Sequence, residues 1–237
     1  MDFELLLVVA TFVSGLIWLI DRLVFRPRRR ARLAHEARDL GAEASIEARA
    51  VKNNEPLLVD YAKSFFPILL VVLVIRSFLF EPFRIPSGSM MPTLLVGDFI
   101  LVNKFTYGLR LPVTNRKIVE LGAPERGDVV VFRPPHHPDQ DWIKRVIGLP
   151  GDRIGYYDNQ VFINGEVLAY DSSGAYNGHG KGAEMTGAEL LTERLPGRTH
   201  AILERSTLFL GQGEGEWTVP PGHYFVMGDN RDNSEDS

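Results

Sequence analysis

Two apolar stretches near the N-terminus constrain the fold of this chain more than any other feature. The first, LLLVVATFVSGLIWLI over residues 5–20, is just long enough to cross a hydrocarbon core of about 30 Å. The second, FFPILLVVLVI over 65–75, reaches that length when the apolar residues on either side of it are added and Arg76 snorkels to the interface. We therefore expect transmembrane helices over residues 1–21 and 61–80.

The charges beside the first stretch predict its orientation. Acidic Asp2 and Glu4 precede it, and a cluster of arginines at 22–32 follows it. A cleaved signal peptide would instead carry basic residues before its apolar run. Because positive charge collects on the cytoplasmic side, we expect residues 22–60 to form a basic cytoplasmic loop. Two crossings then place the N-terminus and residues 81–237 outside the cytoplasm.

Composition limits the remaining possibilities. The 237 residues are 45% hydrophobic and 24% charged, which is typical of globular proteins with one or two domains. The net charge of −4 argues against nucleic acid as a partner. The absence of cysteine excludes disulfides, thiolate metal sites and a cysteine nucleophile.

The part after the second span has the pattern of an all-β domain. It alternates short apolar runs with turn residues and has no long amphipathic helix. The expected strands lie at 99–103, 129–132, 142–148, 152–157, 160–165 and 223–229. Asn164-Gly165 predicts a tight hairpin turn. The glycine-rich region at about 165–218 is expected to be an insertion or extended hairpin.

Two serines stand just before this domain, in the segment PSGSMMP over residues 86–92. Ser87 and Ser89 are separated by Gly88 and flanked by two prolines, which disfavour a helix. A polypeptide laid beside this segment would meet a hydroxyl and a backbone N–H together, as acyl transfer requires. The alternative is a serine-containing linker between a membrane anchor and a domain.

Histidine does not supply an evident base for such a serine. His136 and His137 lie in the proline-rich loop PPHHPDQD, where a metal site is the less favoured alternative to simple solvent exposure. The remaining extracytoplasmic histidines, 179, 200 and 223, form no recognisable Ser/His/Asp set. We expect no metal.

Lys144 is a better candidate. Strand alternation places it on one face with Trp142 and Val146, so its amine is expected to be desolvated. A lysine acts as a base near neutral pH only when burial lowers its pKa by several units from about 10.4. The alternative is an edge-strand lysine that extends into water.

The segment GDNRDNSEDS over 228–237 is a dense polar loop after a strand. It lacks the spacing of an EF-hand calcium loop. Its hydroxyls and carboxylates could instead form a network that orients a buried amine.

These motifs, taken in order behind two spans, resemble type I signal peptidase, the bacterial leader peptidase, in its Gram-negative two-span form. They are PSGSMMPTL (86–94) with GDFILVNKF after it, RGDVVVF (126–132), IKRVIGLPGD (143–152) and GDNRDNSEDS (228–237). The resemblance implies a serine–lysine endopeptidase fold without a cofactor, bound to the inner membrane, with its N-terminus and catalytic domain in the periplasm. Its implied partners are the lipid bilayer and the signal peptides that it cuts after Ala-X-Ala type sites, and it is expected to be a monomer.

The resemblance also implies roles for individual residues. Ser89 matches the nucleophile and Lys144 the general base, while Ser87 matches a serine of the oxyanion hole. Ser234 matches a serine that orients the lysine, and Asp236 matches a nearby carboxylate. Pockets for small side chains would be lined by Ile85, Met90, Leu94, Trp142 and Ile143, with Trp142 standing where relatives carry tyrosine.

Relatives continue beyond GDNRDNSEDS with an arginine that pairs with the carboxylate matched by Asp236. We therefore expect either that the sequence is a fragment or that the protein is impaired in activity, with Asp236 lacking this partner. Two other functions compete with a membrane peptidase. One is a self-cleaving repressor-like protein, against which the two spans and the lack of a DNA-binding segment count. The other is a membrane-tethered protein that binds leader peptides without cutting them.

Overall fold

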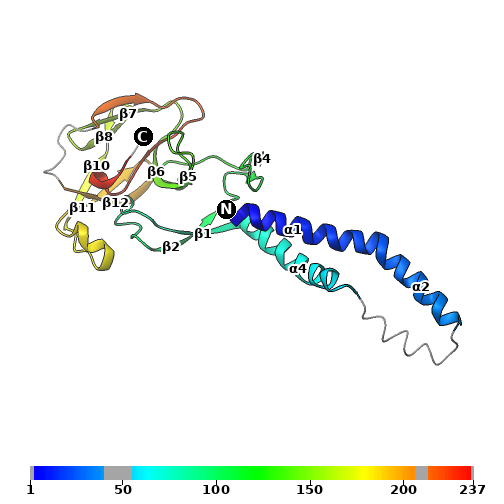
Figure 1. The fold of residues 1–237 in the computed structure, drawn as a ribbon. Helices are drawn as coiled ribbons and strands as arrows, with labels where there is room; N and C mark the ends of the chain where they lie inside the picture. Colours follow the sequence, from blue (N-terminus) through cyan, green and yellow to red (C-terminus); the bar gives the residue numbers. More distant parts are fainter. Residues whose placement is uncertain (1–2, 40–54, 206–212, 236–237) are drawn as a thin grey trace. The chain divides into compact units, whose positions relative to one another are not determined.

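The computed structural model describes residues 3–39, 55–205 and 213–235 (Figure 1). The chain forms two compact units. One comprises residues 1–81 together with 103–121, and the other comprises 82–102 together with 122–237. The first unit carries the long helices, and the second carries most of the strands.

Two long helices dominate the first unit. Helix α1 (Phe3–Ile20) continues through a π-helical turn at Asp21–Phe25 into α2 (Arg26–Asp39). Helix α4 (Leu57–Val74) continues through a second π-helical turn at Ile75–Leu79. Both are long and apolar enough to cross a membrane.

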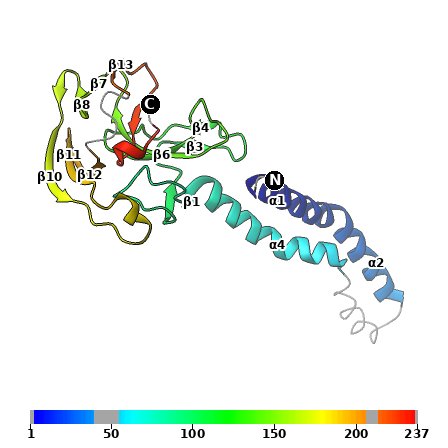
Figure 2. The same cartoon turned by 60° about the vertical axis from the view of Figure 1, so that its left-hand side comes forward.

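Helices α1 and α4 pack side by side, as both views show (Figures 1 and 2). Gly15 permits a close approach, since a Cβ at this position would lie 2.6 Å from Cε2 of Phe66. Trp18 stacks on the same ring with centroids 5.6 Å apart. Most other large apolar side chains of these helices are exposed, which is what a lipid-facing surface requires.

The first unit also contains a short hairpin that the apolar pattern of the sequence does not predict. It is formed by β3 (Leu109–Arg110) and β4 (Lys117–Val119). Its strands are only two and three residues long, which is too short for an alternating pattern to be recognised.

The second unit is built from sheets in the orders β14-β6-β5, β13-β7-β8-β9 and β10-β11-β12, all with antiparallel neighbours. A further two-stranded sheet joins β1 (Phe80–Arg84) to β2 (Phe99–Asn103). The other strands are β5 (Val129–Phe132), β6 (Trp142–Gly148), β7 (Arg153–Tyr157), β8 (Gln160–Ile163), β9 (Glu166–Val167), β10 (Ala169–Ala175), β11 (Glu189–Leu195), β12 (Arg198–Glu204), β13 (Gly215–Thr218) and β14 (Phe225–Met227).

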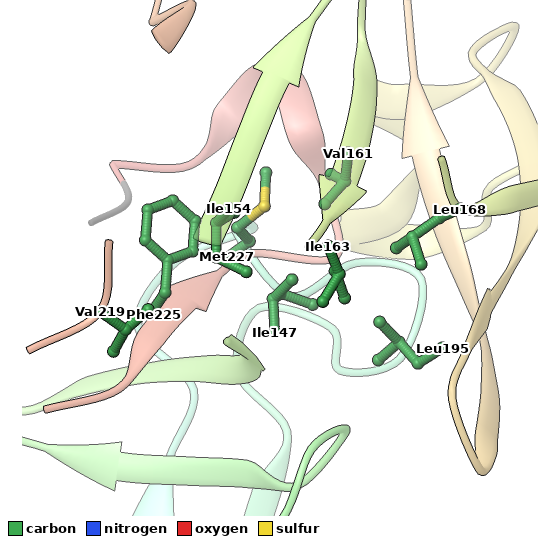
Figure 3. Packing of buried hydrophobic residues seen from close by; sticks show 9 residues of the cluster. All are labelled: Ile147, Ile154, Val161, Ile163, Leu168, Leu195, Val219, Phe225 and Met227. Carbon is green, nitrogen blue, oxygen red and sulfur yellow. The ribbon is translucent and has the colours of Figure 1, made fainter. Parts of the chain in front are cut away.

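One apolar core joins the three larger sheets of this unit (Figure 3). Ile147 of β6 and Phe225 of β14 contribute to it, as do Ile154 of β7 and Val161 of β8. Each fully buried side chain of this size stabilises the fold by about 1.5–3 kcal/mol. The core therefore fixes β6 and β14, the strands that carry or precede the predicted site residues.

The mainly β fold agrees with the sequence prediction. The strands expected at 99–103, 129–132 and 142–148 coincide with β2, β5 and β6. The hairpin expected at Asn164-Gly165 joins β8 to β9, with φ of 54° and 87° at its two central residues. The region at 165–218 is more regular than its glycine content suggests, because its described part forms the sheet β10-β11-β12 and strand β13.

Candidate active site

The segment with the two serines forms a series of turns between β1 and β2, not a helix. Ile85 anchors its start, because its N–H donates to the carbonyl of Asp98 at 2.9 Å and its carbonyl accepts from Gly97 at 2.8 Å. The hydroxyls of Ser87 and Ser89 lie 3.3 Å apart. Ser87 is exposed, whereas Ser89 is buried at the base of the turn.

Two clusters of buried apolar side chains hold this segment in place. Ile85 and Met90 pack with Ile143 of β6, and Leu94 lies against the same cluster. Met91 is fully buried in a second cluster with Met185, Ala188 and Leu203. Because Met90 packs in the first cluster and Met91 in the second, the backbone next to Ser89 is held on two sides and has little freedom to move.

Lys144 occupies the middle strand of the sheet β14-β6-β5, and only 4% of its surface is exposed. Its Nζ donates a hydrogen bond to Oγ of Ser234 and lies 5.5 Å from the ring centroid of Trp142. The alternative of an edge-strand lysine in water is wrong, because β6 is paired on both sides and the amine is buried.

Ser89 and Lys144 line the same cleft, which has a volume of about 360 Å³. The other lining residues come mainly from the serine segment, from the start of β6 and from the polar loop after β14. They are Ile85, Pro86, Ser87, Met90, Gln140, Asp141, Trp142, Ile143, Asn233 and Glu235. Of the predicted pocket residues, only Leu94 is absent from this lining, since it packs in the apolar cluster beneath. Asp236 lies outside the described residues.

Asn230 is a site residue that the sequence analysis missed. Its N–H donates to the carbonyl of Ser89 at 2.9 Å, and its Nδ2 donates to the carbonyl of Gly88 at 3.1 Å. It is fully buried. The polar loop therefore fixes the orientation of the Gly88–Ser89 backbone directly. The only signal in the sequence was the concentration of polar residues at 228–237, which does not identify the partner.

A buried ion pair also connects the site's segments. Asp229 accepts two hydrogen bonds from Arg145 and one, at 2.5 Å, from the hydroxyl of Thr93. Arg145 additionally donates to the carbonyl of Gly127 at 2.8 Å. Full pairing is required here, because an unpaired charge at such depth would be strongly destabilising.

A second buried network lies on β11 and β12. Glu193 is fully buried and accepts two hydrogen bonds from Arg231, each at 2.8 Å, and lies 3.1 Å from Nε2 of His200. Burial by itself raises the pKa of the Glu193 carboxyl, but the charge of Arg231 and the adjacent imidazole of His200 outweigh it and hold the pKa to about 2. Glu193 is therefore ionised and ties the polar loop to this sheet.

The described residues contain no group of three histidine, aspartate or glutamate side chains arranged to hold a metal ion. In the loop PPHHPDQD, His136 is exposed, and His137 is half-buried against Trp142.

A family model and the similar proteins all point to one family. The family model for signal peptidase, peptidase S26, matches residues 58–237. Signal peptidase I of Pseudomonas fluorescens is 51% identical over an alignment that covers 100% of this chain and 82% of that protein. The corresponding protein of Pseudomonas aeruginosa is 48% identical with the same coverage. A solved signal peptidase I from Enterococcus faecalis is 32% identical, covering 48% of this chain and 84% of that one, but its TM-score of 0.28 is too low to support a structural argument.

Proposed function

Because this chain belongs to the signal peptidase family, peptidase S26, we propose that Ser89 is the nucleophile and Lys144 the general base of its reaction. The chain is a serine endopeptidase that removes signal peptides from preproteins. The observation that supports the two roles is that Ser89 and a buried Lys144 line one cleft, with the amine held by Ser234.

The reaction proceeds in two halves. The neutral amine of Lys144 takes the proton of the Ser89 hydroxyl while the serine oxygen attacks the scissile carbonyl carbon. When the tetrahedral intermediate collapses, the C–N bond breaks and the leaving amine takes the proton back from Lys144. The signal peptide is then an ester of Ser89. Water, deprotonated by the same amine, attacks this ester. The bond to the Ser89 oxygen then breaks, this oxygen takes the proton back from Lys144, and the signal peptide leaves with a free carboxyl group.

The remaining predicted roles form part of this proposal. The hydroxyl of Ser87 and the N–H of Ser89 would donate to the oxyanion, and the 3.3 Å separation of the two serine hydroxyls supports this role for Ser87. Ser234 would fix the direction of the lysine amine. Asp236 would act as a supporting carboxylate.

The apolar part of the cleft would select small side chains before the cut. Ile85, Met90, Trp142 and Ile143 line it, and Leu94 closes the cluster behind them. A cleft walled by bulky side chains favours alanine over leucine because a larger side chain would overlap the wall. We therefore assign Ala-X-Ala type sites as the substrates.

The two apolar helices and the bacterial relatives indicate an inner membrane protein. Its proposed topology places residues 22–60 in the cytoplasm, and the N-terminus and the catalytic unit in the periplasm. The chain has no cysteine, so single cysteines at Ala31 and Ser173 give a direct test. In intact spheroplasts a membrane-impermeant thiol reagent should label Ser173→Cys but not Ala31→Cys. Labelling of only Ala31→Cys would reverse the topology.

Cleavage of a purified preprotein with an Ala-X-Ala site tests the catalytic roles. Ser89→Ala and Lys144→Ala should each lower kcat by at least about 1,000-fold, because the two residues act as a unit. Ser87→Ala should lower it less, by roughly 100-fold, the effect of losing one oxyanion donor.

The matched control is Ser173→Ala, a serine on the exposed strand β10. It should cleave at the wild-type rate. Full activity in either Ser89→Ala or Lys144→Ala would refute the assigned dyad. Retained binding of the preprotein by an inactive wild-type chain would favour a tethered binding protein instead.

A further inference from the structure

The loop that joins β5 to β6 folds back on the wall of the cleft. His137 lies in this loop. Its imidazole stacks on the indole of Trp142, with ring centroids 5.9 Å apart and the ring planes 25° from parallel. Two tight turns give the loop this shape, because His137 N–H donates to Pro134 and the carbonyl of His137 accepts from Gln140, each at 3.1 Å. The stacked contact is therefore part of a folded loop.

Trp142 is a large side chain of the cleft wall and is in contact with this loop. It lines the cleft as the first residue of β6, opposite Phe132 of β5 in the strand register. Its ring also lies 5.5 Å from the amine of Lys144. A change in the rotamer of this large side chain would alter both the width of the cleft and the surroundings of the amine.

The loop holds Trp142 at more than one point. Besides the stacked imidazole, Gln140 Oε1 accepts a hydrogen bond from the indole N–H at 3.5 Å. The loop itself is closed at its base by an ion pair of Asp141 with Arg133 at 2.9 Å. These contacts are exposed and so contribute little on their own. The stacked imidazole is half-buried and covers ring surface, so it is the contact best able to restrict the indole.

We propose that His137 is a positioning residue that holds Trp142 against the cleft and thereby limits the size of the side chain accepted before the cut. The proposal rests on the function proposed above, in which Trp142 lines a substrate pocket. Without the imidazole, the indole gains rotational freedom and the cleft can widen. Alanine would still be accepted, while larger side chains would gain access.

The test compares peptides with alanine, valine or leucine at the first or third position before the cut, using the full chain in detergent. His137→Ala should raise kcat/KM for the larger residues relative to alanine by about 3- to 10-fold, the range that one aromatic contact supplies. Its kcat for the alanine peptide should stay within about 2-fold. His137→Phe keeps a flat ring and should restore the wild-type selectivity.

His136→Ala is the matched control, since it removes the neighbouring, exposed imidazole of the same loop. It should retain the wild-type selectivity. An unchanged selectivity in His137→Ala, or the same change in His136→Ala, would overturn the proposal. A purely structural role for His137 would lower the rates for all peptides equally, which also overturns it.

A binding experiment separates this inference from the assignment of the dyad. Labelled forms of the same peptides are titrated into Ser89→Ala and Ser89→Ala/His137→Ala by fluorescence anisotropy, which needs no cleavage. The second protein should bind the leucine peptides relatively more tightly, by about 3- to 10-fold. Equal selectivity in the two proteins overturns the role of His137 even if cleavage assays support the dyad. A shift in binding selectivity supports the role of His137 even if the cleavage assays do not support the dyad.

Discussion

The guanidinium of Arg145 meets the carboxylate of Asp229 through two hydrogen bonds, Nε to Oδ1 at 2.8 Å and Nη2 to Oδ2 at 2.7 Å. Arg145 directly follows Lys144 on β6, and Asp229 directly precedes Asn230 in the polar loop. Because Thr93 also donates to Asp229, the pair connects the strand of the proposed base, the loop that holds it and the segment that follows Ser89.

We expect Arg145→Ala to destabilise the protein by about 3–5 kcal/mol, because it leaves the buried carboxylate of Asp229 without its cationic partner. Denaturant unfolding followed by near-UV circular dichroism measures this loss. The control is Arg194→Ala, which removes an ion pair with Asp171 whose side chains are 59% and 54% exposed. That variant should lose no more than about 1 kcal/mol. Comparable losses in the two variants would contradict a special contribution from the buried pair.

The general fold could be predicted from the sequence because its signals are local. A strand such as Trp142–Gly148 shows its length and faces through alternation, and Asn164-Gly165 identifies a turn by itself. The cleft could be predicted in outline because its motifs resemble those of a known family. Seven of the predicted site residues do line one cleft.

The pairings that fix the site could not be predicted in this way. Alternation places Arg145 on the opposite face from Lys144, but it does not say that Asp229, 84 positions later, lies there. The contact between Asn230 and Gly88 spans 142 positions. His200 and Glu193 likewise read as an isolated histidine and an ordinary strand carboxylate until the backbone register brings them together. Such contacts depend on the packing of whole sheets, which one sequence pattern does not encode.

Ser234→Ala should lower kcat by about 10- to 100-fold while KM stays near the wild-type value. The variant removes the hydroxyl that accepts from the Lys144 amine, so the proposed base loses its fixed direction without any change in the substrate pocket. Steady-state kinetics with an Ala-X-Ala peptide separate the two constants. Ser234→Thr, which keeps the hydroxyl, should recover part of the rate. A raised KM with an unchanged kcat would place Ser234 in substrate binding.

Gly228→Ala should inactivate the enzyme by displacing the polar loop. A Cβ at this position would lie 2.5 Å from the carbonyl oxygen of Ser89 and would also overlap Oγ of Ser234, so the backbone of the loop has to move. Gly155→Ala is the comparison, because its Cβ would lie 3.3 Å from a movable tyrosine ring. We expect cleavage to be lost in the first variant and kept in the second. Wild-type cleavage by Gly228→Ala would show that this backbone contact is not needed.

The ionised Glu193 makes the fold sensitive to acid. Its pKa in the folded protein is about 2, against 4.5 as the ordinary value, so its contribution is complete above pH 4.5 and is lost as the pH falls towards 2. The difference corresponds to about 3 kcal/mol. Burial raises the pKa of the Glu204 and Asp232 carboxyls, so these two groups stabilise the folded protein as the pH falls, opposite to Glu193. The effect of Glu193 must therefore be measured as the difference between the wild type and Glu193→Gln. Free energies of unfolding measured from pH 6 to pH 3 should fall more steeply for the wild type, and parallel curves would show that Glu193 is not the group responsible.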